Sequence, residues 1–532
     1  MLKRMYVFLF ECLIVFILYG CNNDGNNRQS DDGAVLSKEY CGNCHKYPDP
    51  SLLSKEAWKN GVLPMMGSFA NMYRDKDSSY EMLTPEMVAT IRNPAFNSLQ
   101  FSISVENWKK IVDYYVASAP EVLKNTKVDI EAVRLPFDIK IPAKKAQAFT
   151  GHISYNEEDK LIFQSNIKDS LLNIYDNKLQ LKDCLRHCKG VVDVTKINND
   201  STEDAYLVTE IGSFPPTKEA NGCVEKITLK NGKITGREML LKNLYRPVQS
   251  IMKDMDNDGK ADLVVCEFGW ITGQLSLFKN MGNGKYEKST SSSLPGAEKM
   301  YVDDINGDGL PDLWVLFSQA REGIVQFINK GNGKFEQKQL LSFPPCYGST
   351  YFQLADMDND GEKEIIYTFG DNADYSEILK PYHGVYIFKK IGNNYKQVFF
   401  QHLNGCFKAV PVDINGDGKL DLVTISFFAD YTQETNGGFA VLINNGGYSF
   451  KAYTDTSFAN TGRWLCMDVK DVNGDGKPDI LLGNTPMNPG NKEELMKRMN
   501  GPEFIVLQNA YSYKNLGVGR TGDKVKAGVK RY

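Results

Sequence analysis

One acidic nonapeptide occurs five times in the second half of the chain, and this repeat restricts the possible folds more than any other feature. The copies begin at Asp254, Asp304, Asp356, Asp413 and Asp471, and their sequences are DMDNDGKAD, DINGDGLPD, DMDNDGEKE, DINGDGKLD and DVNGDGKPD. Successive copies start 50, 52, 57 and 58 residues apart. A period in this range is typical of one propeller blade or one solenoid unit.

Each copy carries oxygen-bearing side chains at positions 1, 3, 5 and 9, a spacing that can surround a hard cation. Ca²⁺ takes about six to eight oxygen ligands, and glycine at position 6 permits the sharp bend of such a loop. Carboxylates this close repel one another unless a divalent ion compensates their charge. We therefore predict about five calcium sites, formed by Asp254, Asp256, Asp258 and Asp262; Asp304, Asn306, Asp308 and Asp312; Asp356, Asp358, Asp360 and Glu364; Asp413, Asn415, Asp417 and Asp421; and Asp471, Asn473, Asp475 and Asp479.

The competing interpretation of these loops, an EF-hand, does not fit. An EF-hand needs glutamate at position 12 and flanking helices, whereas position 12 here is Val265, Val315, Tyr367, Thr424 and Leu482. An apolar stretch typical of a strand follows each loop: LVVCEF, LWVLF, IIYTF, LVTISF and ILLG. Pieces such as GQLSLFKNMGNGKYE, a strand, a Gly/Asn turn and a second strand, come next. We therefore predict a four-stranded blade for each repeat.

The repeat resembles the FG-GAP or VCBS repeats of integrin-type β-propellers, in which a D-x-[DN]-x-D-G-x-x-D loop binds calcium. The resemblance implies a mainly β fold with a calcium-binding propeller over residues 148–512. Glu364 replaces the usual aspartate at position 9, and its longer side chain is expected to weaken that site. One period upstream, a degenerate copy from Lys196 to Asp204 has lysine at position 1 and is predicted to bind no calcium.

We predict seven blades, with six or eight as alternatives and an open solenoid less favoured. Residues 150–190 are predicted to form a further metal-free blade, and the strand containing Val506 belongs to the last one. The ring is expected to close with a strand from residues 130–145, in the segment 123–147, or with one from the C-terminal end.

The first twenty residues predict export. Lys3 and Arg4 precede an apolar run from Met5 to Tyr19, which contains Glu11 and leads to Cys21. The ending resembles a bacterial lipobox, which implies that Cys21 carries lipid and that the protein is anchored to a membrane of the cell envelope, facing the periplasm or the cell surface. Ordinary cleavage or an uncleaved anchor are the alternatives. Residues 21–33 are polar and are expected to form a tether.

A second motif, Cys41-Gly-Asn-Cys44-His45, has the C-x-x-C-H pattern of covalent haem c attachment. The two thiols would form thioethers with the haem, and the imidazole would be the proximal iron ligand. Helices are predicted from residue 34 to His45, from a Ser54 cap onward, and over 107–118, where Trp108 lies on the apolar face.

This arrangement resembles a class I cytochrome c, whose first and last helices cross behind the haem. The resemblance implies a small all-α haem domain over residues 34–122, before the propeller. Such a domain usually has methionine as its sixth iron ligand. Met66 fits the family's Leu-Pro-x-Met pattern best, and Met65, Met72, Met82 and Met87 are the alternatives.

Composition and the remaining side chains exclude several other classes. The chain has 62 basic and 66 acidic residues, so it lacks the basic excess typical of nucleic-acid binding. Only the N-terminal run is apolar enough to enter a bilayer, which argues against a polytopic membrane protein. Four histidines outside the motif are scattered in sequence, and no catalytic constellation is evident, so enzymatic activity is uncertain and not favoured. Seven cysteines outside the N-terminal motifs have no deducible pairing (Cys184, Cys188, Cys223, Cys266, Cys346, Cys406 and Cys466).

We predict an envelope-anchored electron carrier whose propeller serves as a docking scaffold for a redox protein partner. Long insertions in the last three blades, with Tyr375, Tyr382 and Tyr431, suggest a carbohydrate or protein ligand on one propeller face. The alternative is a quinoprotein-like propeller dehydrogenase that passes electrons to its own cytochrome domain, although the tryptophan-docking motif of quinoprotein propellers is absent. Sensing of redox state or of a small gas is a third option. The basic tail, residues 513–532, is expected to be partly ordered.

Overall fold

The computed structural model describes residues 24–69, 103–124, 126–143, 147–197, 203–214, 217, 219–270, 272–372, 378–433, 435, 437–486 and 501–511. The predicted signal peptide, Cys21, the alternative ligands Met72, Met82 and Met87, and the tail from residue 513 lie outside these residues. The chain divides into two compact units: a smaller, helical one that comprises the described residues up to Lys124 together with Phe343–Cys346, and a larger one that contains every described strand. No described helix is both long and apolar enough to cross a bilayer.

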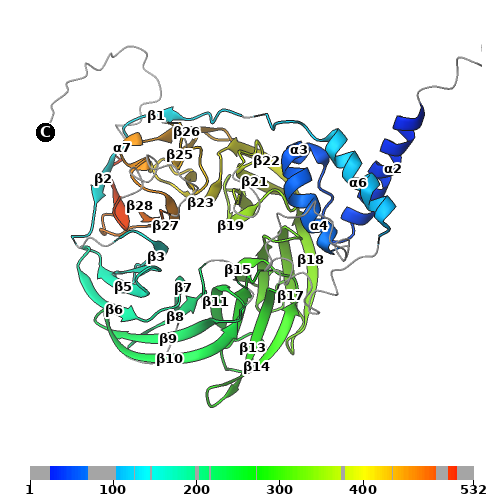
Figure 1. Cartoon of the computed structure of the whole chain (residues 1–532). Helices are drawn as coiled ribbons and strands as arrows, with labels where there is room; N and C mark the ends of the chain where they lie inside the picture. The colour runs from blue at the N-terminus through cyan, green and yellow to red at the C-terminus, as the bar shows by residue number, and fades with distance from the viewer. Residues whose placement is uncertain are drawn as a thin grey trace, which may run out of the picture. The chain divides into compact units, whose positions relative to one another are not determined.

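The larger unit is a β-propeller of seven antiparallel sheets, which confirms the predicted fold and blade number (Figure 1). In blades 1 to 5, four consecutive strands pair in sequence order. Blades 1 and 2 are formed by β3 (Thr150–Asn156), β4 (Leu161–Asn166), β5 (Leu171–Asp176) and β6 (Leu181–Arg186), and by β7 (Val191–Ile197), β8 (Asp204–Glu210), β9 (Gly222–Lys230) and β10 (Lys233–Leu244).

The next three blades have the same plan. They are formed by β11 (Pro247–Lys253), β12 (Asp262–Glu267), β13 (Gln274–Gly282) and β14 (Lys285–Ser292); by β15 (Ala297–Asp303), β16 (Asp312–Phe317), β17 (Gly323–Asn329) and β18 (Phe335–Ser342); and by β19 (Ser349–Ala355), β20 (Glu364–Phe369), β21 (Gly384–Ile391) and β22 (Asn394–His402).

The last two blades incorporate strands from the segment that precedes the propeller. Blade 6 consists of β23 (Cys406–Val412), β24 (Asp421–Ser426), β25 (Phe439–Asn444) and β26 (Phe450–Thr454), with β1 (Glu131–Ala132) added in parallel to β26. Blade 7 consists of β27 (Trp464–Lys470), β28 (Asp479–Asn484), β29 (Phe504–Asn509) and β2 (Phe137–Lys140).

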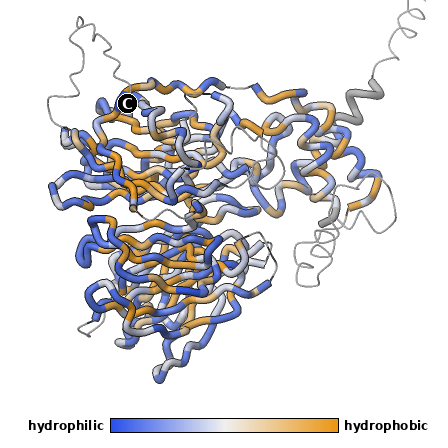
Figure 2. The backbone as a smooth tube through the Cα atoms, turned by 60° about the vertical axis from the view of Figure 1, so that its left-hand side comes forward, coloured by the Kyte–Doolittle hydropathy of each residue, from blue (hydrophilic) through white to orange (hydrophobic). Residues whose placement is uncertain are grey.

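The strands that follow the five acidic loops form the interior of their blades. Every residue of β12, β16, β20, β24 and β28 is buried. Sheets covered on both faces require such continuous apolar runs rather than alternation, and these are the five stretches predicted as strands. Figure 2 shows apolar residues along the strands and polar residues at the turns that protrude from them.

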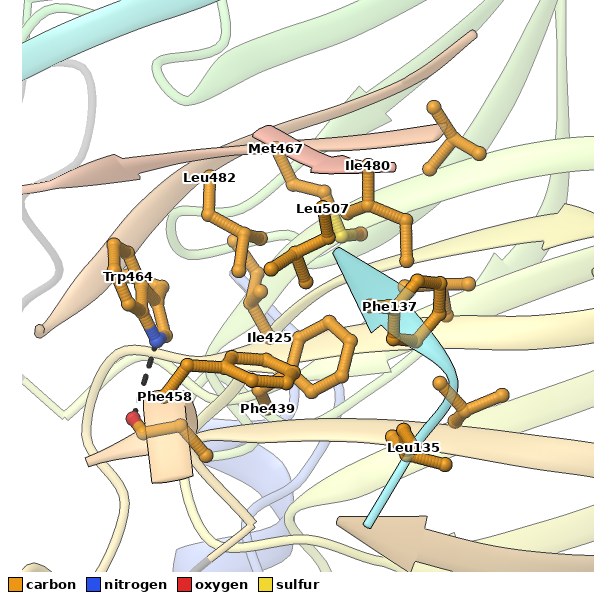
Figure 3. Packing of buried hydrophobic residues seen from close by; sticks show 14 of the residues in the cluster. Leu135, Phe137, Ile425, Phe439, Phe458, Trp464, Met467, Ile480, Leu482 and Leu507 are labelled. Carbon is orange, nitrogen blue, oxygen red and sulfur yellow. Dashed lines mark hydrogen bonds between the residues drawn. The ribbon is translucent and has the colours of Figure 1, made fainter. Parts of the chain in front are cut away.

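The ring closes through β2, the first of the two predicted sources of a closing strand. Phe137 pairs with Asn509 and Lys140 with Val506 in an antiparallel register. Phe137 is buried in a cluster with Phe458 and Trp464, where the Trp464 Nε1 donates to the Ala459 carbonyl at 3.1 Å in the short helix α7 (Thr456–Ala459) (Figure 3). Burying a side chain of this size contributes about 2 kcal/mol, so closure stabilises the blade through packing as well as pairing.

The N-terminal unit is helical. Its elements are α2 (Asp24–Cys41), the 3₁₀ turn η1 (Pro50–Leu52), α3 (Lys55–Ala57), the π turn η2 (Trp58–Val62), α4 (Leu63–Phe69) and α6 (Val105–Ser118). Ser54 caps α3 as predicted, because its hydroxyl accepts from the Ala57 N–H at 3.2 Å. Trp108 is buried on α6, as the predicted apolar face requires.

Helix α2 differs from the prediction at both ends. It begins at Asp24, so residues 24–33 are helical where a tether was expected, and it ends at Cys41 rather than His45. The Lys110 Nζ on α6 lies 3.8 Å from an Asp32 carboxylate oxygen, a contact between helices that local sequence pattern does not reveal.

Two contacts order the interior of this unit. A Cβ on Gly33 would lie 2.5 Å from the Lys110 carbonyl oxygen, so only glycine permits α2 and α6 to approach this closely. The rings of Trp58 and Tyr115 meet edge to face with centroids 4.6 Å apart. Their polar atoms donate to the carbonyls of Pro50 and Pro48 at 2.8 and 2.7 Å. Helix α6 is therefore fixed against the rest of the unit by packing and by satisfied polar groups.

Candidate metal and haem sites

The carboxylate at position 1 organises each acidic loop. In blade 4, Asp304 accepts hydrogen bonds from the backbone N–H of Asp308 at 3.1 Å and of Gly309 at 2.9 Å. The same two bonds, to positions 5 and 6, occur in the other four loops. Each loop is thus folded around its first carboxylate, and this fold brings positions 5 and 6 next to position 1.

Two positions in every loop adopt left-handed backbone. Glycine at position 6 has φ between +83° and +91° in all five copies. Position 4 also has positive φ, and it is Asn257, Gly307, Asn359, Gly416 and Gly474. Asparagine and glycine are the residues that enter this region most readily. The sequence interpretation missed this requirement, although the exclusive use of Asn and Gly at position 4 was a readable signal.

Position 9 is buried in all five loops and serves the fold as well as the site. Asp312 is 0% exposed, and its carboxylate accepts from the Ile305 N–H at 2.9 Å and from the Asn329 N–H at 2.6 Å. The asparagine is a partner that sequence reasoning did not find. It recurs at the end of the third strand of four blades, as Asn280, Asn329, Asn444 and Asn509.

Blade 5 departs from this pattern at two linked places. Position 9 is Glu364 instead of aspartate, and the residue in register with the recurring asparagine is Lys390. Glu364 is buried and accepts from the Met357 N–H at 2.8 Å, as the aspartates do from position 2. The longer side chain therefore keeps one of the two bonds that position 9 makes elsewhere.

Burial and hydrogen bonding move the pKa values of the loop carboxyls in opposite directions. Burial raises the pKa of Asp421 at position 9 to about 7, and it also raises the pKa values of Asp262, Glu364 and Asp479. At position 5, a hydrogen bond from the Lys260 N–H lowers the pKa of Asp258. A cation beside position 9 would favour the ionised form that burial disfavours.

The donor set fits a divalent cation. In blade 3, carboxylate oxygens of Asp254, Asp256 and Asp262 lie within 4.8 Å of one another, and in blade 5 those of Asp356, Asp358 and Asp360 do so. Asp256 Oδ1 and Glu364 Oε1 are buried without a hydrogen-bond partner among the described residues. In blades 4, 6 and 7 an asparagine at position 3 contributes an amide oxygen instead. Oxygen ligands of this kind suit Ca²⁺.

The degenerate loop of blade 2 contains an ammonium at its first position. The Lys196 Nζ lies 3.4 Å from the Asp204 carboxylate at position 9 and 2.8 Å from Asp159. These contacts raise the pKa of Lys196, while the same lysine helps to lower that of Asp159 against the effect of burial. The absence of calcium from this loop stays a prediction, and the ion pairs favour it because they supply the positive charge internally.

The C-x-x-C-H residues lie where helix α2 ends. Cys41 is its last residue, and Cys44 and His45 follow in a turn, all three half-buried. Burial raises the pKa of the Cys41 thiol to about 11. The His45 Nδ1 lies 3.1 Å from the Lys46 carbonyl oxygen. A metal-ligating histidine typically uses one ring nitrogen in this way, which directs the lone pair of the other nitrogen toward the metal.

Other parts of the helical unit bear on haem binding. Met66, with Met65 beside it, lies on α4 and is half-buried. The Trp108 Nε1 on α6 is buried and has no hydrogen-bond partner among the described residues. An unsatisfied buried donor is unusual in a protein interior and is relieved by a bound polar group. The two thiols and the imidazole of Cys41, Cys44 and His45 are a donor set that fits a haem c site.

The cysteines and histidines of the propeller have structural surroundings. Among the described residues, Cys184, Cys188, Cys223, Cys266, Cys406 and Cys466 form no disulfide. His383 and His402, far from the other two histidines in sequence, come together: the His402 Nδ1 lies 2.9 Å from the His383 carbonyl oxygen. Burial lowers the pKa values of both, so they are neutral side chains of the blade 5 interior.

Comparison with known proteins identifies the repeat. The profile of the FG-GAP-like repeat family matches residues 254–315, 304–367 and 413–482. All five acidic loops lie inside these matched segments. The chain therefore contains FG-GAP-like repeats arranged in a seven-bladed β-propeller, as the sequence resemblance implied.

Solved structures resemble the chain only distantly. A chain in the S. cerevisiae complex of Dbp5 bound to Nup159, Gle1, IP6 and ADP is 13% identical, with 72% of this chain and 98% of that one covered, at a TM-score of 0.39. The luciferin-regenerating enzyme is 10% identical, with 71% and 99% covered, at 0.34. BBS1N in complex with ARL6DN is 10% identical, with 74% and 99% covered, at 0.43. Likeness at this level carries no functional information.

Proposed function

We propose that this protein is a cell-envelope lipoprotein that joins a c-type haem electron-transfer module to a calcium-stabilised FG-GAP-like propeller, which acts as a binding or docking scaffold. The observation that carries the proposal is the C-x-x-C-H turn at the end of α2, with the His45 Nδ1 beside the Lys46 carbonyl oxygen. Haem c, when bound, supplies reversible one-electron chemistry at iron.

The residues of the helical unit have distinct roles in this proposal. Cys41 and Cys44 attach the haem, His45 is the proximal ligand, and Met66 is the sixth ligand. The contact of the His45 Nδ1 with Lys46 fixes the ring orientation. The close approach of α2 and α6 at Gly33 supports the likeness to class I cytochromes c, whose first and last helices cross.

In the propeller, Ca²⁺ in the acidic loops would neutralise carboxylates that the fold has already gathered. Because such ions bind the folded loops and not the unfolded chain, they add stability by mass action. A propeller stiffened in this way gives a redox partner, or a carbohydrate or protein ligand, a fixed surface. The N-terminal lipid on Cys21 would keep the whole chain at a membrane of the envelope, and the redox partner would be another envelope protein.

Haem content is the decisive measurement. We expect the full chain, exported in a host that attaches haem c, to retain peroxidase-active haem after denaturing electrophoresis. C41S together with C44S should abolish this haem, whereas C184S, a control outside the motif, should leave it unchanged. M66A should alter the visible spectrum of the haem, and C21A should release the protein from the membrane fraction. Wild-type protein without covalent haem would contradict the proposal.

A separate measurement addresses the scaffold. Chelation by EDTA should lower the melting temperature of the propeller, and added Ca²⁺ should restore it. Steady oxidation of a sugar or an alcohol by the isolated protein, with reduction of its own haem, would instead favour a propeller dehydrogenase. A propeller whose melting temperature is indifferent to both EDTA and Ca²⁺ would remove the calcium part of the proposal.

A further inference from the structure

Two lysines occupy the same place in two of the five acidic sites. On β13, Phe278 pairs with Leu263, the residue after position 9, and Lys279 follows Phe278. On β21, Phe388 pairs with Ile365 in the same way, and Lys389 follows it. In the remaining three blades the residue in this register is Ile328, Ile443 or Gln508. A cationic side chain is therefore aimed at the loop in blades 3 and 5, and in blades 4, 6 and 7 an uncharged side chain takes its place.

The ammonium of Lys389 lies among three carboxylates of its loop. Its Nζ contacts Asp358 at position 3, lies 2.6 Å from Asp360 Oδ2 at position 5, and lies 3.5 Å from Glu364 Oε1 at position 9. These are three of the four side chains predicted to bind the cation. The lysine also lies over the ring of Tyr448, 5.8 Å from its centroid.

Lys279 repeats this arrangement in blade 3. Its Nζ contacts Asp256 at position 3 and lies 3.7 Å from Asp258 Oδ2 at position 5. Asp256 Oδ1 is buried and has no hydrogen-bond partner in the part of the chain that the structure describes. Each lysine thus approaches its loop from the third strand of its blade and engages the oxygens at positions 3 and 5.

The lysines occur only where the loop has an additional carboxylate. Blades 3 and 5 have aspartate at position 3, as Asp256 and Asp358, whereas blades 4, 6 and 7 have asparagine there. Four carboxylates with one ammonium and three carboxylates alone both give a formal charge of −3. The four predicted ligands, counted with this lysine where it is present, therefore carry the same formal charge in both kinds of loop, but in one kind a positive charge is already in place.

We infer that Lys279 and Lys389 are resident cations that divide the calcium sites into two classes. In blades 3 and 5 the ammonium holds the loop together without a metal ion, and Ca²⁺ must displace it from positions 3 and 5. In blades 4, 6 and 7 the third strand has no lysine in this register, and the one lysine contact among their described ligands, from Lys419 to Asp417 at 3.3 Å, involves position 5 alone, so Ca²⁺ binds more tightly and the loop depends on it. This inference rests on the calcium part of the proposed function and adds the residues that set the affinity of each site.

Calcium titration of the EDTA-stripped full chain by isothermal calorimetry tests the inference. We expect three tight sites and two sites at least tenfold weaker in the wild type. K279I and K389I introduce the residue found at positions 328 and 443, and together they should convert the two weak sites into tight ones. K390I is the matched control, because Lys390 is the next residue on β21 and contacts Glu362 at 3.4 Å rather than positions 3, 5 or 9. It should leave the titration unchanged.

Stability measurements cover variants that fold poorly. In EDTA the double variant K279I/K389I should melt at a lower temperature than wild type, because its loops lose their internal cation. Saturating Ca²⁺ should abolish this difference in melting temperature. The reverse variant I328K should weaken one tight site at least tenfold. Five equal sites that K279I, K389I and I328K leave unchanged would overturn this inference and leave the calcium scaffold standing. No calcium binding to any variant would overturn both.

Discussion

The acidic loops of the propeller and the C-x-x-C-H turn of the helical unit differ in how far their candidate ligands also hold the fold together. In the propeller, Asp312 is a predicted metal ligand, yet it is wholly buried and accepts two backbone hydrogen bonds. In the helical unit, Cys44 and His45 are half-buried in a turn, and the packing depends on Gly33, Trp58 and Tyr115. A site that shares its residues with the fold is harder to alter than one added to it.

The largest effect should come from position 9. D312A leaves the N–H groups of Ile305 and Asn329 buried without partners, which should lower the free energy of unfolding by about 3 kcal/mol. D308A, at the exposed position 5 of the same loop, should cost less than about 0.5 kcal/mol when calcium is absent. Urea unfolding in EDTA measures both. Equal effects of the two substitutions would show that position 9 serves only as a ligand.

The helical unit should respond most strongly at the crossing of α2 and α6. G33L places a side chain against the Lys110 carbonyl, and the clash should destabilise this unit by about 2 kcal/mol. A117L, on the exposed side of α6, adds similar bulk without a clash and serves as the control. Hydrogen exchange should show lost protection over residues 105–118 in G33L and unchanged protection over 262–267. Protection that survives in G33L would mean that the helices do not need this close contact.

A further effect should come from a buried carboxyl of the propeller that is not a predicted metal ligand. Burial raises the pKa of Glu298 on β15 to about 8, with the nearby carboxylates of Asp371 and Glu322 acting in the same direction, against a hydrogen bond from Ser318. The folded state therefore retains a proton that the unfolded chain releases near pH 4.5, so this group's contribution to stability falls as pH rises from there through about 8.

E298Q removes this titration. Its urea midpoint, measured relative to that of wild type, should rise steadily between pH 5 and pH 8. Measurements in EDTA keep the calcium sites from contributing. A wild-type midpoint that rises relative to E298Q over the same pH range would reverse the sign and contradict the buried, protonated carboxyl.

The smallest effect on the propeller should come from the C-x-x-C-H motif itself. C41S together with C44S should change the free energy of propeller unfolding by less than about 0.5 kcal/mol, because both cysteines belong to the other compact unit. Calorimetry of the calcium-loaded protein resolves the propeller transition. A shift of that transition by several degrees would show that the unfolding of the two units is coupled.

Much of the propeller could be predicted from the sequence, because its information is local and repeated. A nine-residue loop, a buried strand and a Gly/Asn turn recur with a nearly constant period, so each copy supports the interpretation of the others. The same reasoning located the candidate ligands from Asp254 to Asp479 and the closing segment near Phe137. The C-x-x-C-H motif is equally easy to recognise, since it needs only five adjacent residues, and haem attachment to it stays a prediction.

Only the tertiary structure decided the contacts between residues far apart in the chain. Three contacts join segments that no periodic pattern connects. The Asn329 N–H donates to Asp312, Lys389 pairs with the carboxylates of its loop, and β2 pairs with β29. The helical conformation of residues 24–33 was not predicted either. This part of α2 contacts α6 at Gly33, and the local sequence contains no helix signal. Local patterns specify turns and strands, whereas packing selects which distant side chains meet, and here that selection brings Lys279 and Lys389 to the carboxylates of their loops.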